Sequence, residues 1–129
     1  MVKYILRLIL VCSLVCCIGT GVYAETFSDP VFYQTFATLQ QSKTVNFLLM
    51  TNYSVDSIKV TKCWLQTKEN GVWGNDQVID HPNNAPDGTV YNVDFSYSSV
   101  IVNSGTYRIK YIAEADGHSI TRYSTSYTF

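Results

Sequence analysis

Residues 106–115 read TYRIKYIAEA, and this stretch decides the fold class. Apolar side chains alternate along it with charged ones: Tyr107, Ile109, Tyr111 and Ala113 against Arg108, Lys110 and Glu114. A period of two residues is typical of a β-strand with one face on a core and the other in water. We therefore predict a strand over 106–115 whose apolar side chains point inward.

Similar runs rich in Val, Ile, Thr, Tyr and Phe recur after residue 30, and Asn70-Gly71 between two of them is a strong hairpin signal. The predicted strands are 31–39, 44–52, 57–68, a return strand that begins at 72–73 and continues at 77–79, 89–97, 106–115 and 119–129. We expect 44–52 to be central, because both its faces are apolar, and 119–129 to lie at an edge. The pattern predicts an all-β fold, an antiparallel two-sheet sandwich of about seven strands.

The phase of the strand predicted over 57–68 is ambiguous. Ile58 and Val60 set one phase, and Leu65 is out of phase with them. Either Trp64 points inward with the first two residues, or a β-bulge near Lys62 shifts the phase of the strand. The sequence leaves both alternatives open.

The first 24 residues have the organisation of a secretory signal. Lys3 and Arg7 are their only charged residues, an apolar run follows over 8–18, and a small residue, Ala24, ends the segment. We predict a signal peptide over 1–24, cleaved between Ala24 and Glu25, and a single exported β-sandwich domain over 25–129.

Three alternatives compete with a cleaved signal. An uncleaved membrane anchor over 8–24 is barely long enough, since spanning a bilayer takes about 17–25 residues. A lipoprotein signal would acylate Cys16 or Cys17, but Val15 and Cys16 stand where such a signal has a small residue. A buried N-terminal helix would need an amphipathic pattern that this segment lacks. We therefore expect a secreted, extracellular protein, with membrane anchoring by 8–24 as the alternative.

The net charge of residues 25–129 argues against two classes of binding partner. Lys3 and Arg7 account for two of the nine Lys and Arg residues, so 25–129 hold seven against ten Asp and Glu, a net charge of −3. This balance argues against a nucleic-acid partner, which needs a basic face. It also argues against electrostatic docking on an anionic membrane, so membrane contact is expected only through an uncleaved signal.

Cys63 is the only cysteine after residue 24 and has no partner for an internal disulfide. We expect it to be a small buried hydrophobe on a strand, with a bond to another molecule as the alternative. An exported domain without a disulfide fits a bacterial source better than the eukaryotic secretory route.

Residues 105–113, GTYRIKYIA, followed by 116–119, DGHS, resemble the penultimate strand and final hairpin of fibronectin type III and immunoglobulin-like domains. The resemblance implies that Tyr107 packs at the corner where its strand begins and that Trp64 is the buried core tryptophan. The inter-sheet cysteine pair is absent, so the resemblance does not extend to antibody-type domains.

The layout of the chain also resembles small secreted Gram-positive proteins of unknown function. The matching residues are Leu65-Gln66, Asn70-Gly71-Val72-Trp73 and Tyr107-Arg108. This likeness covers most of 31–127 and implies a fold and a compartment. It implies no activity, because the sandwich fold hosts many unrelated functions.

Aromatic residues offer the most suggestive candidate site. Residues 25–129 hold eight Tyr, six Phe and two Trp, many of which must fill the core. We expect Trp73, Tyr123, Tyr127 and either Tyr97 or Tyr91 to be partly exposed. The candidate binding surface is formed by Trp73, Tyr97, Tyr123 and Tyr127. Exposed aromatic rings stack on sugars or anchor protein partners. The alternative is a core accompanied by scattered surface tyrosines.

Two other sequence patterns suggest a functional site less strongly: a loop with possible calcium ligands, and a cysteine with two histidines. Oxygen ligands for calcium gather around one loop, at Asp76, Asp80, Asn83, Asn84 and Asp87. They follow no fixed ligand order, so solvated loop residues are the better interpretation. Cys63 with His81 or His118 would make a nucleophile and base, but no oxyanion-hole loop accompanies them. We predict no catalytic residue, no metal and no cofactor.

The sequence thus predicts a secreted, non-enzymatic interaction module for an extracellular protein or a cell-envelope glycan. One alternative is an exported antimicrobial or toxin-like polypeptide, which the net charge of −3 disfavours. Another is a small secreted hydrolase, which would need a cleft of titratable groups with perturbed pKa values.

Overall fold

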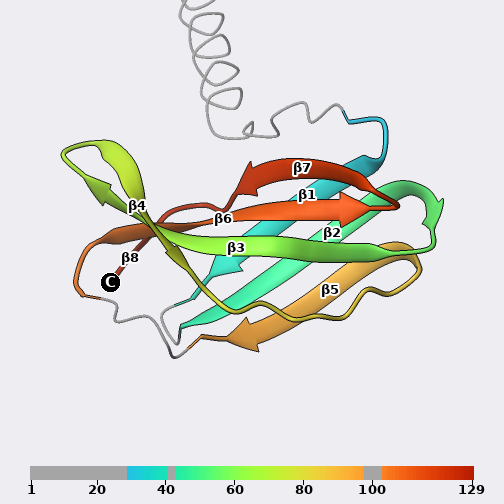
Figure 1. Ribbon diagram of the computed structural model, residues 1–129. Coiled ribbons are helices and arrows are strands. Elements are labelled where there is room, and N and C mark those ends of the chain that lie inside the picture. Colours follow the sequence, from blue (N-terminus) through green and yellow to red (C-terminus); the bar gives the residue numbers. More distant parts are fainter. Residues whose placement is uncertain (1–28, 41–42, 98–102) are drawn as a thin grey trace, which may run out of the picture.

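The computed structural model describes residues 29–40, 43–97 and 103–129, which form two antiparallel β-sheets packed face to face (Figure 1). The strands are β1 (Phe32–Leu39), β2 (Thr44–Val55), β3 (Ile58–Glu69), β4 (Val72–Val78), β5 (Gly88–Ser96), β6 (Thr106–Ala115), β7 (His118–Tyr123) and β8 (Tyr127–Thr128). One sheet has the order β1-β2-β5, and the other has the order β4-β3-β6-β7 with β8 also paired to β6. The predicted all-β two-sheet sandwich is confirmed. The predicted signal over 1–24 and its cleavage site lie outside the described residues.

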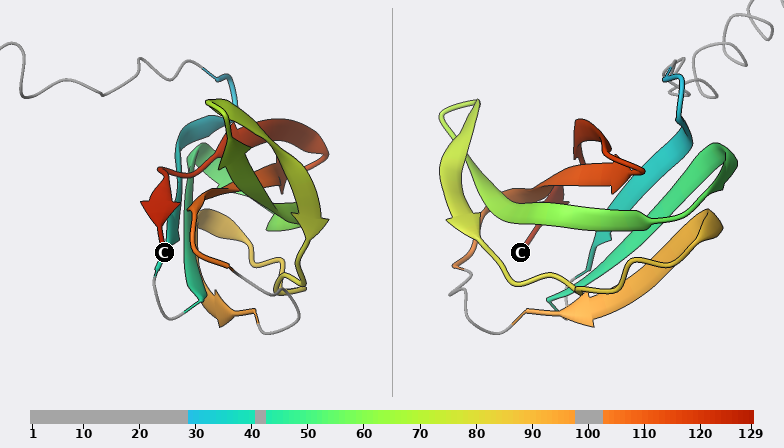
Figure 2. Two further views of the ribbon diagram at one scale, coloured as in Figure 1. Left: turned by 90° about the vertical axis from the view of Figure 1, so that its left-hand side faces the viewer. Right: turned by 45° about the vertical axis from the view of Figure 1, so that its right-hand side comes forward.

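The core lies between the two layers, which Figure 2 shows from two further sides. Alternate residues of β6 are buried as predicted: Tyr107, Ile109, Tyr111 and Ala113. In β2, which lies between β1 and β5 as the predicted central strand, the buried residues are Val45, Phe47, Leu49 and Thr51. The ring of Phe47 packs on Tyr111 with centroids 5.0 Å apart and on Phe95 at 5.6 Å. Aromatic contacts therefore join the two sheets at the centre of the core.

The sheet layout is that of an immunoglobulin-like sandwich with one strand placed differently. In constant-type immunoglobulin domains the fourth strand joins the first sheet, whereas here β4 pairs with β3 in the sheet of β6 and β7. Tyr107 sits near the start of β6, and its hydroxyl donates a 2.7 Å hydrogen bond to the carbonyl of Asn103. This is the tyrosine corner of such folds, as the resemblance implied.

A β-bulge settles the phase of β3. Its register against β6 shifts between Val60 and Lys62, and beyond the shift Cys63 and Leu65 are buried. Of the two alternatives that the sequence left open, the structure has the bulge near Lys62, and the predicted burial of the cysteine is confirmed. The prediction that Trp64 is the core tryptophan is wrong, because the bulge turns this residue to the outer face of the sheet.

The last predicted strand, 119–129, is divided into β7 and β8, which makes eight strands instead of about seven. At the division, the hydroxyl of Ser124 accepts a 2.8 Å hydrogen bond from the backbone N–H of Ile109. The backbone N–H of Ser124 donates to the carbonyl of Ile109, also at 2.8 Å. A side chain thus replaces one rung of the backbone ladder, and the strand is interrupted there. β7 itself ends the order of its sheet, as the predicted edge strand.

Candidate functional site

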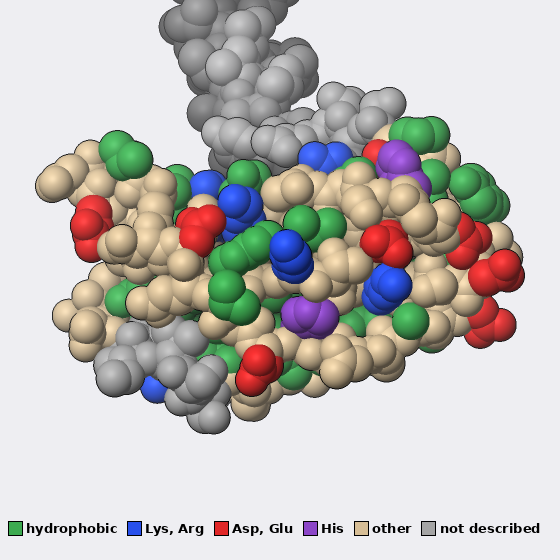
Figure 3. Space-filling model, viewed as in Figure 1, with side chains coloured by type: hydrophobic (Ala, Val, Ile, Leu, Met, Phe, Trp, Pro, Cys, Tyr) green, Lys and Arg blue, Asp and Glu red, His purple; other side chains and the backbone are tan. Residues whose placement is uncertain are grey.

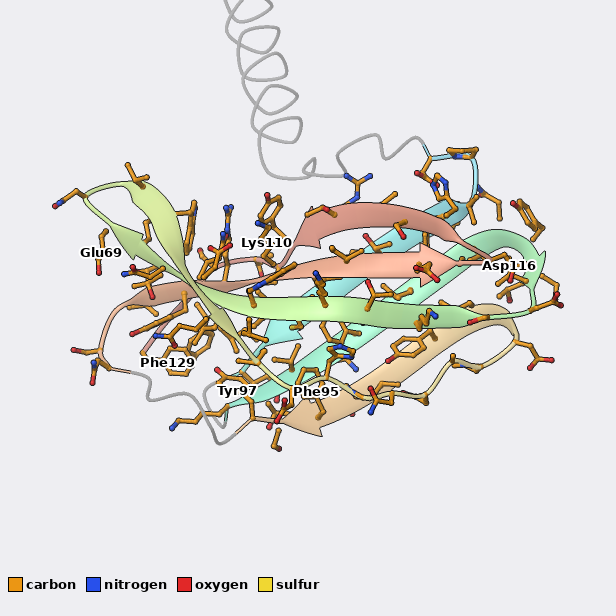
Figure 4. All side chains as sticks on the ribbon, in the orientation of Figure 1. Glu69, Phe95, Tyr97, Lys110, Asp116 and Phe129 are labelled. Atoms are coloured by element: carbon orange, nitrogen blue, oxygen red, sulfur yellow. The ribbon has the colours of Figure 1, made fainter. Side chains whose placement is uncertain are left out.

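The outer face of the β4-β3-β6-β7 sheet carries aromatic and cationic side chains on neighbouring strands. Cross-strand pairing sets Lys68 against Trp73, Gln66 against Arg108, and Lys110 against both Trp64 and Tyr123. We call this surface the ladder face, made of Trp64, Gln66, Lys68, Trp73, Asp76, Arg108, Lys110 and Tyr123. Figure 4 labels Lys110 within it.

Arg108 stacks against two aromatic rings at the centre of the ladder face. Its guanidinium carbon lies 4.4 Å from the ring centroid of Trp73 and 4.1 Å from that of Tyr123. Trp73 belongs to β4 and Tyr123 to β7, the two ends of the sheet order, and Arg108 comes from β6 between them. Each contact of this kind contributes about 0.5–2 kcal/mol, so the stack holds its three side chains in place.

A chain of hydrogen bonds lies beside the stack. Nε of Arg108 donates to Oε1 of Gln66 at 2.8 Å, and Nε2 of Gln66 donates to Oδ1 of Asp76 at 2.7 Å. Oδ2 of Asp76 accepts from Nζ of Lys110 at 3.3 Å. Gln66 is 6% exposed, so both ends of a buried amide are satisfied.

These contacts shift the ionisation of two groups. The hydrogen bond from Gln66 and the nearby charges of Lys110 and Arg108 hold the pKa of Asp76 below its usual range, against a smaller opposing effect of burial. Burial lowers the pKa of Arg108, and Tyr123 and Asp76 oppose that effect. Since the ordinary pKa of Arg is above 12, the guanidinium is charged at neutral pH.

Two lysines extend the pattern beyond Arg108. Nζ of Lys110 lies 5.0 Å from the ring centroid of Trp64, and Nζ of Lys68 lies 5.6 Å from that of Trp73. Each of the aromatic rings on the ladder face therefore has at least one cation over it.

A bulge in β4 places Asp76. The register runs from Thr67 opposite Gly74 to Leu65 opposite Gln77, so two residues of β4 face one residue of β3. Asn75 in the bulge has a φ of 52°, a left-handed conformation that Asn tolerates better than most residues. The bulge turns the next side chain, Asp76, toward Gln66.

The β3–β4 hairpin extends beyond the sandwich at one end, where Glu69 lies, and Asp116 marks the opposite end (Figure 4). The turn has φ values of 52° at Asn70 and 78° at Gly71, as a type I′ hairpin turn requires, so the hairpin predicted at Asn70-Gly71 is confirmed. An open hollow of about 300 Å³ lies along the hairpin, lined by Thr67, Glu69, Asn70, Val72, Trp73, Gly74 and Asn75. Trp73, which belongs to the stack, is part of its lining.

No family model, curated protein or solved structure matches this chain. The function therefore has to be inferred from the site itself.

The structure brings together two of the four aromatic residues predicted for the binding surface. Trp73 is half-buried and Tyr123 is 48% exposed, and Arg108 joins them. Tyr127 is half-buried, contacts the tilted ring of Phe129 with centroids 4.8 Å apart and packs against the core, outside the stack of Trp73, Arg108 and Tyr123.

The prediction of an exposed Tyr97 is wrong. Its side chain is 3% exposed, because it continues the inward phase of Tyr91 beyond the end of β5. Burial raises its pKa to about 12, and neighbouring Cys63 and Tyr107 act in the same direction.

Sequence reasoning missed the polar members of the ladder face. Arg108 and Lys110 were predicted to point outward, but only the strand register shows which rings they meet. Gln66 and Asp76 carry no sequence signal of their own, because the β4 bulge creates their contact.

The residues considered as a nucleophile and base, and those considered as calcium ligands, contact other groups instead. Burial raises the pKa of the Cys63 thiol, which opposes thiolate formation, and Nε2 of His118 lies 3.0 Å from Oδ2 of Asp29. Nδ1 of His81 lies 3.0 Å from the carbonyl of Pro82. Of the calcium candidates, Asp76 already contacts Gln66, and Oδ1 of Asn84 accepts a 3.3 Å hydrogen bond from Tyr91.

Within residues 29–40, 43–97 and 103–129, no three His, Cys, Asp or Glu side chains lie close enough together to hold a metal ion. Over the same ranges, no helix has the length and apolar character needed to cross a bilayer.

Proposed function

We propose that the chain is a secreted, non-enzymatic interaction module that binds an extracellular protein or a cell-envelope glycan through the ladder face. The observation that carries this proposal is the guanidinium of Arg108 held between Trp73 and Tyr123 on an open sheet face. Trp, Tyr and Arg are the residue types most enriched among those that dominate binding energy at interfaces.

The stack supports binding because its side chains are ordered before a partner arrives. Arg108 makes two ring contacts and one hydrogen bond to Gln66. Immobilising a long side chain at an interface costs about 0.5–1.5 kcal/mol, and that cost is reduced when the free protein already holds it.

The signal-like organisation of residues 1–24 supports export. The antimicrobial alternative has less support because the net charge of 25–129 is −3. The hydrolase alternative has less support because Cys63 is buried and burial raises its thiol pKa.

The test is binding of labelled protein comprising residues 25–129 to the surface of the producing cells. We expect Arg108→Ala to weaken binding about tenfold or more, since it removes the centre of the stack. Val90→Thr is the matched control, because Val90 is 50% exposed on the outer side of the other sheet. The proposal is overturned if wild-type protein does not bind, or if both variants bind as well as wild type while remaining folded by circular dichroism.

A further inference from the structure

The free edge of the Arg108 guanidinium is the feature of the ladder face best suited to a ligand. Its guanidinium carbon lies over the rings of both Trp73 and Tyr123, and its Nε donates to Gln66. The edge that carries Nη1 and Nη2 makes no hydrogen bond to the parts of the chain that the structure describes. Two parallel N–H groups on a fixed plane match the geometry of a carboxylate or a phosphate.

The distribution of positive charge also favours a carboxylate or a phosphate as the ligand. Residues 25–129 hold seven Lys and Arg, and five of them lie on the outer side of β3 and β6: Lys59, Lys62, Lys68, Arg108 and Lys110. In Figure 3 the cationic side chains run along the middle of this face. Strands β1, β2 and β5 of the other sheet hold a single charged residue, Asp94. A chain with a net charge of −3 thus concentrates its cations on one surface.

The cations that lie over the aromatic rings favour an acidic protein over an acidic glycan as the partner. A sugar stacks on a ring face that is open to solvent, but Trp73 and Tyr123 turn a face toward Arg108. Trp64 likewise has a face under Lys110. Trp, Tyr and Arg together are also the composition of protein interaction hot spots.

We propose that the ladder face binds an acidic segment of a protein, one carboxylate of which takes two hydrogen bonds from the Nη edge of Arg108. Lys68 and Lys62, both exposed on the same face, attract neighbouring carboxylates of the segment. This inference rests on the proposed function, because it specifies the partner of the same surface.

The experiment measures fluorescence anisotropy of a labelled peptide of Glu-Ser repeats titrated with protein comprising residues 25–129. A Gln-Ser repeat peptide of equal length is the uncharged comparison, and an oligogalacturonate is the acidic-glycan comparison. We expect the Glu-Ser peptide to bind, the Gln-Ser peptide not to bind, and the affinity to fall as salt rises from about 50 mM to about 200 mM.

Three variants locate the contact. Arg108→Gln should weaken binding of the Glu-Ser peptide about tenfold or more, since a charge-assisted pair of hydrogen bonds is lost. Arg108→Lys keeps the charge without the planar fork, so it should retain the salt dependence at lower affinity. Lys43→Gln removes the same charge from the β1–β2 turn, and its affinity should stay within about twofold of wild type.

The outcomes separate this inference from the proposed function. If the oligogalacturonate binds in an Arg108-dependent way and the peptide does not, the acidic-protein assignment is overturned while a binding role for the ladder face stands. If Arg108→Gln and Lys43→Gln weaken peptide binding equally, attraction is non-specific and the inference fails. If Arg108→Ala abolishes cell binding but no acidic peptide binds, the inference alone fails.

Discussion

At the scale of single residues, Tyr107 shows how one hydroxyl group fixes a corner of the fold. Its side chain is 6% exposed, and its hydroxyl donates a 2.7 Å hydrogen bond to the carbonyl of Asn103. We expect Tyr107→Phe to lower the free energy of unfolding by about 1–2 kcal/mol, because a part-buried carbonyl loses its donor. Urea denaturation would show this as a lower midpoint with an unchanged slope. Tyr33→Phe is the control, since Tyr33 is 59% exposed, and an equal loss in the two variants would contradict the role of the corner.

Cys63 provides a second residue-scale prediction. Its side chain is fully buried, and burial raises the pKa of the thiol, so both access and thiolate formation are suppressed. We expect the thiol of protein comprising residues 25–129 to react with an aromatic disulfide reagent only after denaturation. A full equivalent of rapid labelling under native conditions would contradict the burial. A species of doubled mass that reduction halves would instead indicate an intermolecular bond.

Asp29 ties the start of the described chain to β7. Burial acts to raise the pKa of its carboxyl, but hydrogen bonds from the N–H groups of Phe32 and Val31 and from His118 outweigh burial, so the pKa is lowered from 3.8. The folded state therefore binds this proton more weakly than the unfolded state does. The resulting stabilisation is present above about pH 4 and is lost as the pH falls through the lowered value.

We expect Asp29→Asn to be less stable than wild type at neutral pH, with the difference shrinking below about pH 4. Thermal unfolding across this pH range measures the effect. Asp94→Asn is the control, because it removes a different carboxylate that also accepts a hydrogen bond. Asp94 lies on the outer side of β5, accepts its hydrogen bond from Asn46 and is remote in sequence from His118. A gap between Asp29→Asn and wild type that stays constant with pH would count against the carboxylate as the source of the stabilisation.

At the scale of elements, alternation predicts strands well and bulges poorly. The strand over 106–115 has the predicted bounds and inward residues, because one uninterrupted phase covers it. The β3 bulge was left as one of two alternatives, and the outward position of Trp64 depends on it. The β4 bulge was not predicted at all, although it places Asp76 against Gln66. The ladder face could not be predicted for the same reason: its contacts depend on register between strands that are distant in sequence.

The β4 bulge itself is open to test at Asn75, whose φ is 52°. Asn75→Val should destabilise the protein by about 1–2 kcal/mol, since a β-branched residue is strained in the left-handed region. It should also separate Asp76 from Gln66, visible as a changed side-chain amide resonance of Gln66 in an NMR spectrum. Asn75→Gly is the matched control, because Gly adopts the same φ without strain. Equal stability of the two variants would show that the bulge imposes no such conformational demand.

At the scale of the whole molecule, the ladder face connects strands that share no backbone hydrogen bonds. β4 and β7 are the two ends of their sheet order, and the stack of Trp73, Arg108 and Tyr123 crosses the sheet between them. Most residues of β4 are exposed, so few core contacts hold this strand in place. Its attachment therefore rests on pairing with β3, on the stack and on the contacts of Asp76 with Gln66 and Lys110. The same side chains that we propose to bind a partner also hold the edge of the sandwich.

This double role gives a prediction about local stability. Arg108→Ala should speed amide hydrogen exchange in β4, relative to wild type, by a factor of about 2–30, the equivalent of the roughly 0.5–2 kcal/mol in a cation–π contact. Exchange in β2, in the other sheet, should change much less, because Arg108 makes no contact there among the described residues. Lys59→Ala is the control on the same sheet face, since it removes an exposed ion pair of 3.3 Å with Glu114, which contributes little. A uniform acceleration across both sheets would mean that Arg108 acts on global stability. No acceleration in β4 would mean that the stack does not hold the edge strand.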